Sequence, residues 1–200
     1  RLQTDPIGLK KDLMARLAAR GEKATPARVE EELAALQRAA ATLGTIAELR
    51  KRGAQVRYLI CNVTSAEATK AAVRQALDSA GRVDVLLHAA GVEYSRRFER
   101  KTQQEIKQTV AVKDTGFFNL YRALLDHNAL PQHIMAFSSV AARFGNAGQT
   151  DYSAANDLLC RMVSALRCQH PEVKAQVIDW GAWGEVGMAS RGHMPELMKR

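Results

Sequence analysis

The stretch FSSVAARFGNAGQTDYSAAN, residues 137–156, decides how this chain folds and what chemistry it can support. It begins as an apolar strand that ends on two serines, and it continues into a helix that carries Tyr152 and Asn156. Residues four apart lie on the same side of a helix, so these two side chains can face one pocket. Ser139 can meet them from the end of the strand. This group suits the reduction of a carbonyl, in which Tyr152 gives the proton and Ser139 steadies the oxygen. The hydride has to come from a cofactor, because no side chain supplies one.

Apolar runs on both sides of this stretch alternate with helical patterns. We expect strands at 55–61, 83–88, 134–138 and 175–179, separated by helices at 64–79, 102–126 and 151–169. Capping boxes at 64–67 and 102–105 are expected to begin the first two of these helices. This alternation predicts an α/β fold with a doubly wound parallel sheet of the Rossmann-like type and right-handed crossovers. The run 83–88 is apolar enough for a strand covered on both faces. Ligands of such sheets bind beyond the carboxyl ends of the strands, where Asn62, residues 89–92, Ser139 and Gly181 fall.

The first 54 residues have a different character. Two charged amphipathic helices are expected at 9–20 and 26–51, with Thr25 as the N-cap and Pro26 at the first position of the second helix. Gly53 is expected to end that helix. The chain therefore divides into a helical part, 1–54, and an α/β part, 55–200.

Composition excludes several other classes of protein. The 200 residues are 46% hydrophobic and 25% charged, as in a globular domain, and no run approaches the roughly 18 apolar residues of a membrane span. Three cysteines without a C-x-x-C spacing indicate reduced thiols and a cytoplasmic protein. Five scattered histidines give no metal site. The formal charge of +8 is spread among acids, which argues against nucleic acid and favours an anionic cofactor or a negatively charged carrier protein.

Several ordered motifs resemble the ketoreductase domain of polyketide and polyunsaturated fatty acid synthases, within the short-chain dehydrogenase/reductase superfamily. They are HAAGV at 88–92, K-x-x-G at 113–116, the stretch 137–156 and WGAW at 180–183. Ordinary members of the superfamily have an asparagine on the central helix and a lysine four residues after the tyrosine. Here Lys113 and Asn156 exchange those places, as in the ketoreductases of synthases.

The resemblance implies NADPH-dependent reduction of a 3-oxoacyl thioester, held on an acyl carrier protein, to the 3-hydroxyacyl thioester. Lys113 would lower the pKa of Tyr152, directly or through the cofactor's ribose and water, and Asn156 would orient the proton relay. The residues implied in cofactor binding are Arg1, Asn62, Val63, Ala89, Ala90, Gly91 and Gly181.

The resemblance also implies a fragment of a longer multidomain chain. No glycine-rich dinucleotide loop occurs here, so the first strand, that loop and the second strand are expected upstream of Arg1. The absence of an initiator methionine and of an apolar signal region agrees with this expectation. Residues 1–54 would then be the connection between the second and third strands, and residues from about 184 to 200 would form a substrate lid.

Two other functions are compatible with the sequence. One is a free-standing short-chain reductase of another carbonyl, and the other is a catalytically silent structural half-domain. Acyl-carrier or ketosynthase segments in the same polypeptide would favour the synthase. The configuration of the alcohol stays open, because neither residues 93–95 nor Phe144 carry the family's markers for it.

Overall fold

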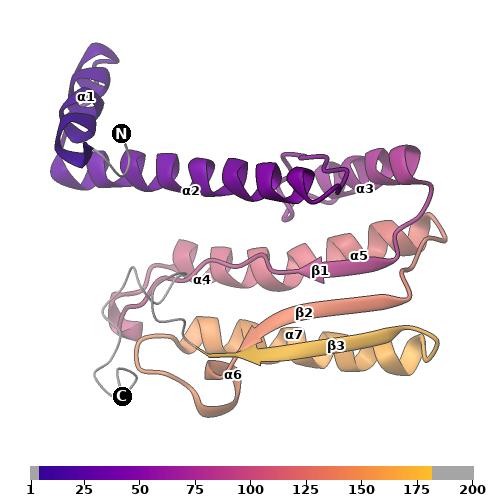
Figure 1. Cartoon of the computed structure of the whole chain (residues 1–200). Coiled ribbons are helices and arrows are strands. Elements are labelled where there is room, and N and C mark those ends of the chain that lie inside the picture. Colours follow the sequence, from indigo (N-terminus) through magenta and orange to yellow (C-terminus); the bar gives the residue numbers. More distant parts are fainter. Residues whose placement is uncertain (1–4, 182–200) are drawn as a thin grey trace. The chain divides into compact units, whose positions relative to one another are not determined.

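The structure is a computed structural model that describes residues 5–181. The chain divides into two compact units between Tyr58 and Leu59 (Figure 1). The division falls a few residues after the end of the N-terminal helices.

The first unit contains the two helices α1, Pro6–Ala19, and α2, Pro26–Lys51. Thr25 caps α2 by accepting a hydrogen bond from the backbone N–H of Arg28 at 3.3 Å, and Pro26 takes the first helical position, as predicted. The helix continues without a break through Gly44, and Gly53 lies beyond its end with φ at 87°. The two helices bury one small apolar cluster, which consists of Leu13, Leu17, Val29 and Leu33.

The predicted strand at 55–61 is not formed in the described part of the chain. Tyr58 and Ile60 are 63% and 92% exposed. A strand is stabilised by backbone hydrogen bonds to a neighbour, and within residues 5–181 no strand runs beside this segment. The prediction was wrong because an apolar pattern records side chains and not the presence of a pairing partner.

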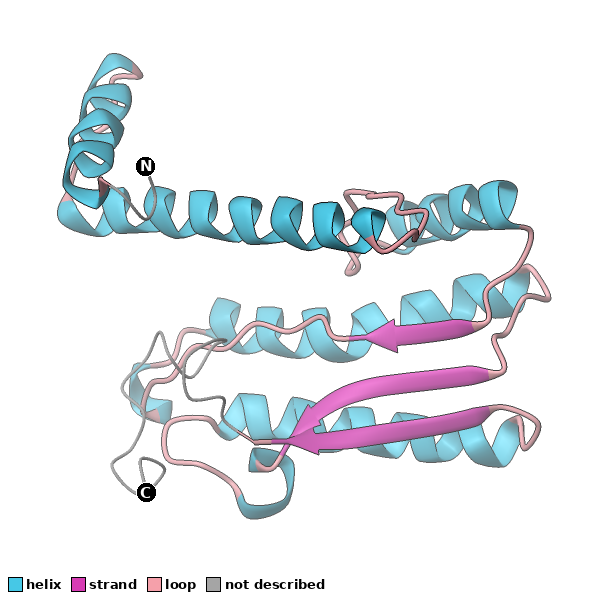
Figure 2. Ribbon diagram, in the orientation of Figure 1, coloured by secondary structure: helices cyan, strands magenta, loops and turns pink. Residues whose placement is uncertain are grey.

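The second unit is built on a parallel sheet, as predicted. Its strands are β1, Val85–His88; β2, His133–Ser139; and β3, Lys174–Trp180, in the order β1-β2-β3 (Figure 2). His88 lies opposite Ala136, and Ser139 lies opposite Trp180. The carboxyl ends of all three strands therefore point to the same edge of the sheet.

Two helical runs cover one face of this sheet (Figures 1 and 2). The first consists of α4, Gln103–Val110, a π-helical segment η2, Ala111–Thr115, and α5, Gly116–Asp126. The second is α7, Thr150–Gln169. Their shared core includes Phe117, Ile134, Ala136, Leu159 and Val163.

The opposite face of β1 is not covered within the described residues. Val85 and Leu87 are 51% and 60% exposed, so the expectation of a strand buried on both faces is wrong for this part of the chain. The reason is the same as for residues 55–61, since an apolar run does not show what lies against it.

The remaining elements connect these layers. Helix α3, Ala66–Ala80, packs on α5 through Val73, Ala123 and Leu124. Its N-cap is Ser65, one residue after the predicted cap. Short helical turns lie at η1, Phe98–Arg100, and α6, Ala141–Phe144. The capping box predicted at residues 102–105 is present at the start of α4.

Candidate active site

The end of β2 and the start of α7 bring together three of the predicted site residues. Ser139 is the last residue of β2, Tyr152 is the third residue of α7, and Asn156 follows one turn later. Tyr152 is 9% exposed and Asn156 is fully buried. The side chains of Ser139 and Asn156 lie close enough to the Tyr152 hydroxyl to act on its pKa through hydrogen bonding. The backbone N–H of Ala141 donates to Ser139 Oγ at 3.2 Å, which helps to fix that hydroxyl.

Ser138 holds this part of α7 against the sheet. Its Oγ donates to the backbone oxygen of Asn156 at 3.2 Å, and the Sγ of Cys160 lies 3.4 Å from the same Oγ. The Asn156 amide nitrogen donates in turn to the backbone oxygen of Tyr152 at 2.8 Å. The sequence analysis gave Ser138 no role of its own. Its signal is that it is a polar residue in an otherwise apolar strand, directly before Ser139.

Burial sets the protonation state of Tyr152. Its pKa is raised above the ordinary value of 10.0, mainly by desolvation and less by the Glu93 carboxylate, while hydrogen bonds with Ser139 and Asn156 act in the opposite direction. The phenol is therefore protonated at neutral pH and can act as an acid. The pKa-lowering effect expected from Lys113 is not among these influences.

Lys113 is buried in the π-helical segment, only 4% exposed. Its Nζ donates to the backbone oxygen of Phe137 at 2.9 Å, two residues before Ser139. Burial lowers the pKa of this ammonium, and the Asp114 and Cys160 side chains raise it. A π segment inside a helix often marks a functional position, because it re-aims side chains and backbone carbonyls.

His88 supports the same segment from the sheet. Its Nε2 lies 2.8 Å from the backbone oxygen of Lys113, and its ring packs edge-on against Phe117. Burial lowers the pKa of His88 to about 4, so the ring is neutral at pH 7. Since a carbonyl can only accept, Nε2 carries the hydrogen. His88 is thus a core histidine whose buried ring nitrogen is hydrogen-bonded.

Asp114 was missed from sequence. It is 3% exposed, and neither of its carboxylate oxygens has a hydrogen-bond partner within the described residues. Burial raises the pKa of Asp114 from 3.8 to about 7, although Lys113 acts to lower it. A signal for this residue was available, since Val110 and Phe117, about one helical turn before and after Asp114, are apolar on a helix that packs against the sheet.

The residues predicted to bind cofactor lie mainly at the same edge of the sheet. Residues 89–91 follow the end of β1, and Gly181 follows β3. A Cβ placed on Gly91 would lie 3.1 Å from Lys113 Nζ, so glycine at this position leaves room for the ammonium. Arg1, Trp183 and the predicted lid lie outside the described residues.

Asn62 and Val63 form a loop that is anchored to α5. The Oδ1 of Asn62 accepts from the backbone N–H and the hydroxyl of Thr64, at 3.1 and 2.9 Å. The backbone oxygen of Val63 accepts from Asn119 Nδ2 at 2.9 Å. Because the Asn62 oxygen already accepts two hydrogen bonds, its amide nitrogen is the group better placed to bind a ligand.

These residues fit the nicotinamide-ribose part of a dinucleotide. Lys113 has three N–H donors and gives one to Phe137, which leaves two for ribose hydroxyls. The buried Oδ1 of Asn156 has no partner in the described part of the chain and can accept from water or a hydroxyl. No glycine-rich loop for a pyrophosphate is present in the sequence.

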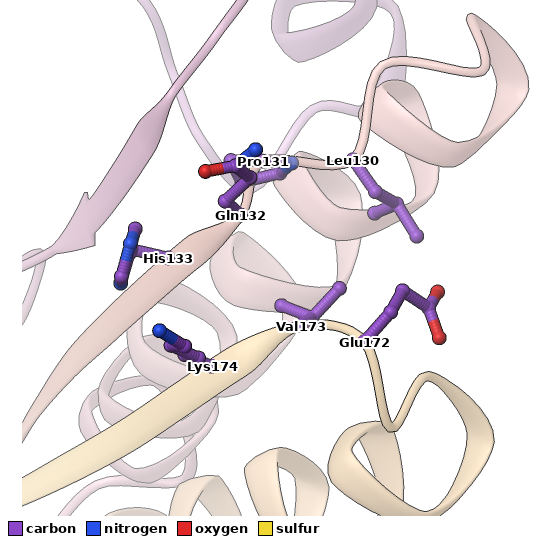
Figure 3. Close-up of a pocket in the computed structure, with 7 residues that line it drawn as sticks. All are labelled: Leu130, Pro131, Gln132, His133, Glu172, Val173 and Lys174. Carbon is purple, nitrogen blue, oxygen red and sulfur yellow. The ribbon is translucent and has the colours of Figure 1, made fainter.

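Other features of residues 5–181 do not compete with this site. A cavity of about 310 Å³ lies between residues 130–133 and 172–174 (Figure 3), at the amino ends of β2 and β3 and thus at the opposite edge of the sheet. Within this range no three His, Cys, Asp or Glu side chains are placed to hold a metal ion. No helix in the described residues is both long and apolar enough to cross a membrane.

Comparison with solved structures defines the class of fold. An alcohol dehydrogenase from the archaeon Thermococcus sibiricus, solved with 5-hydroxy-NADP, superposes with a TM-score of 0.64 at 21% identity, over 72% of this chain and 62% of its own. A short-chain dehydrogenase from Streptomyces avermitilis gives 0.61 at 25% identity, over 68% and 52% of the two chains. The fold is therefore the Rossmann-like fold of the short-chain dehydrogenases.

Sequence comparison identifies the family. The KR domain family matches residues 9–185, and the chain belongs to this family of ketoreductase domains. It is 31% identical over 184 residues to a polyunsaturated fatty acid synthase protein from Thraustochytrium, covering 92% of this chain. It is 35% identical over 130 residues, 64% of this chain, to the short-chain reductase protein NovJ from Streptomyces niveus.

These matches cover a larger share of this chain than of the related proteins. The chain spans 6% of the Thraustochytrium synthase protein and 49% of the NovJ protein. It is also 31% identical to the polyketide synthase PksN from Bacillus subtilis, over 75% of this chain and 3% of that protein. Membership in the KR family places the chain among the oxidoreductases.

Proposed function

We propose that this chain is the catalytic part of an NADPH-dependent β-ketoacyl reductase in a multidomain synthase. The substrate is a 3-oxoacyl thioester on an acyl carrier protein, and the product is the 3-hydroxyacyl thioester. The observation that carries the proposal is the grouping of Ser139, Tyr152 and buried Lys113 around the carboxyl end of β2. Partners are the acyl carrier protein and the other synthase domains.

The residues act on the carbonyl oxygen. NADPH, when bound, supplies the hydride that the β-carbon receives. Tyr152 gives its proton to the oxygen, and because burial keeps the phenol protonated it begins the reaction as an acid. Ser139 donates a hydrogen bond to the same oxygen as negative charge develops on it.

Lys113 stabilises the Tyr152 phenolate, and Asn156 takes part in the relay that returns a proton to it. The ammonium of Lys113 stabilises the ionised Tyr152, directly or through the cofactor's ribose hydroxyls and water. Asn156 accepts from water in this relay through its unpartnered Oδ1. On the cofactor side, Gly91 leaves room for the nicotinamide ribose beside Lys113. The other residues proposed to bind the cofactor are Ala89, Ala90, Asn62, Val63, Gly181 and Arg1.

The domain organisation follows from this proposal. Residues 1–54 connect the second and third strands of the complete fold, and residues 55–200 form the catalytic part, with a substrate lid from about 184. A free-standing reductase is the second candidate, supported by the 35% identity to NovJ. A silent half-domain is disfavoured because such a half would lack the proposed catalytic residues Ser139, Tyr152, Lys113 and Asn156, which this chain carries.

The test is Tyr152→Phe in the intact protein, with oxidation of NADPH by a β-ketoacyl thioester as the readout. We expect kcat to fall by about 10²- to 10⁴-fold, the usual contribution of a positioned acid. Tyr121→Phe is the matched control, because Tyr121 uses its hydroxyl on His170 at 3.1 Å and lies on α5. Undiminished reduction by Tyr152→Phe would refute the role of this residue.

A further inference from the structure

The segment between β1 and α4, residues 93–101, is fixed against the start of α7. The backbone N–H of Arg96 donates to the backbone oxygen of Gly148 at 3.0 Å. Gln149 Nε2 donates to Glu93 Oε1 and to Ser95 Oγ, at 3.1 and 3.2 Å. Gly148 has φ at 78°, and a Cβ there would lie 3.3 Å from the Arg96 backbone. The segment and the helix that carries Tyr152 are therefore held together as one surface.

A buried ion pair fixes the far end of the same segment. Lys101 Nζ lies 2.6 Å from Asp151 Oδ1, and the two side chains are 1% and 2% exposed. Lys101 also donates to the backbone oxygen of Tyr94. Asp151 directly precedes Tyr152, so side chains projecting from residues 95–100 keep a defined position relative to the catalytic phenol.

Arginines from this segment line a hollow of about 720 Å³. The lining residues, named here the arginine hollow, are Ser95, Arg96, Arg97 and Arg100. Arg96 is paired with Glu105 at 3.2 Å. Within residues 5–181, Arg97 and Arg100 have no ion-pair partner and are exposed. Two neighbouring guanidinium groups without an ion-pair partner in this part of the chain form a candidate site for an anion.

The shape of the site favours a small anion on a flexible arm. Guanidinium groups bind phosphate through paired N–H donors, and the concave lining can enclose one tetrahedral group. A carrier-bound acyl substrate always brings one such group, the phosphodiester that joins the pantetheine arm to its carrier.

We propose that the arginine hollow binds the phosphate of the phosphopantetheine arm and so directs the thioester toward Tyr152 and Ser139. This inference rests on the proposed function, since it assumes a carrier-bound substrate. Arg97 and Arg100 provide the charge and the N–H donors, while the Ser95 hydroxyl is used on the Glu93 carboxylate. The ties of residues 93–101 to Gly148, Gln149 and Asp151 keep this anchor at a constant distance from the reacting carbonyl.

The experiment compares two substrates that differ only by the phosphate. The intact protein and its variant with both Arg97→Gln and Arg100→Gln are assayed with the acetoacetyl thioesters of pantetheine and of phosphopantetheine. We expect the intact protein to have a higher kcat/KM for the phosphorylated substrate, and the double variant to lose about 10- to 100-fold on that substrate alone. Arg74→Gln, an exposed arginine on α3, is the matched control and should change neither value.

Each other outcome overturns the inference. An equal loss on both substrates would mean that the arginines support the fold of the site. A raised KM for NADPH with an unchanged preference for phosphate would assign them to the cofactor. A third assay uses the acetoacetyl thioester of an intact acyl carrier protein, and a loss seen only with that substrate would assign the arginines to the carrier's surface. No preference for phosphate by the unmodified protein would end the inference while leaving the proposed reductase in place. An unmodified protein that reduces neither thioester would end both.

Discussion

The pairing of Lys101 with Asp151 gives a prediction whose size can be worked out from the structure. The two side chains are 1% and 2% exposed, and the N–O distance is 2.6 Å. Lys101→Met keeps much of the side-chain volume but leaves the Asp151 carboxylate buried without its counter-charge. Removing one partner of a buried pair costs about 3–5 kcal/mol. This is a large part of the roughly 5–15 kcal/mol that stabilises a typical domain.

The cost should be concentrated at the start of α7, because Asp151 lies in the first turn of that helix. Hydrogen exchange of the backbone amides at 153–156, measured by mass spectrometry on the intact protein, reports the local opening free energy. We expect exchange to accelerate by about 10²- to 10⁴-fold, which is the same free energy expressed as a ratio.

Two variants show whether the loss comes from the unpaired charge. Replacing both partners, Lys101→Met with Asp151→Leu, removes the uncompensated carboxylate and should return exchange to within about tenfold of the unmodified protein. Arg161→Gln breaks an ion pair on the same helix whose side chains are 75% and 32% exposed, and should change exchange by less than about fivefold. The reasoning is refuted if Lys101→Met matches Arg161→Gln, or if the double variant exchanges as fast as the single one.

Two further perturbations test the surroundings of Lys113. Gly91→Ala places a Cβ 3.1 Å from Lys113 Nζ, and this small displacement of the ammonium should lower reductase kcat by about tenfold. Gly44→Ala is the control and should leave kcat unchanged, because nothing lies within 4 Å of a Cβ at that position. A similar kcat for both variants would contradict the close approach of residue 91 to Lys113 Nζ. Asp114 has a folded-state pKa raised from 3.8 to about 7, so the folded state binds the extra proton and the unmodified protein loses stability as pH rises through that window. Asp114→Asn removes this dependence. The midpoint temperature for loss of reductase activity should therefore be higher in the variant than in the unmodified protein, by a difference that grows from pH 4 to about pH 7 and then levels off. A difference that stays constant with pH would show that Asp114 does not titrate in this range.

Local sequence signals predicted the elements that depend on local chemistry. Thr25 with Pro26 begins α2, and the capping box at 102–105 begins α4, as expected from their side chains. The strands β1, β2 and β3 begin and end within two residues of their predicted bounds. For the two caps the deciding groups lie within a few residues of one another in the chain, whereas each of the three strands also has a parallel neighbour that is distant in sequence.

The failures are features that distant residues decide. The apolar pattern at 55–61 does not form a strand in the described residues, because pairing needs a neighbouring backbone. The predicted helix 102–126 contains the π segment at 111–115. There His88, from strand β1, donates a hydrogen bond to the backbone oxygen of Lys113. Lys101 and Asp151 each look like surface charges in sequence, yet they form a pair that is almost fully buried.

The position of Lys113 shows how these distant contacts serve the proposed chemistry. Asn156 occupies the place one turn after Tyr152, and its amide nitrogen is used on the Tyr152 backbone oxygen. A cation for the phenolate must then come from another element. The π segment brings Lys113 to β2, where Nζ bonds to Phe137 two residues before Ser139, and His88 holds the carbonyl of the same residue. Phe137 fixes the ammonium and His88 fixes the backbone of Lys113, and in the proposed reaction this held charge stabilises Tyr152 when the tyrosine loses its proton.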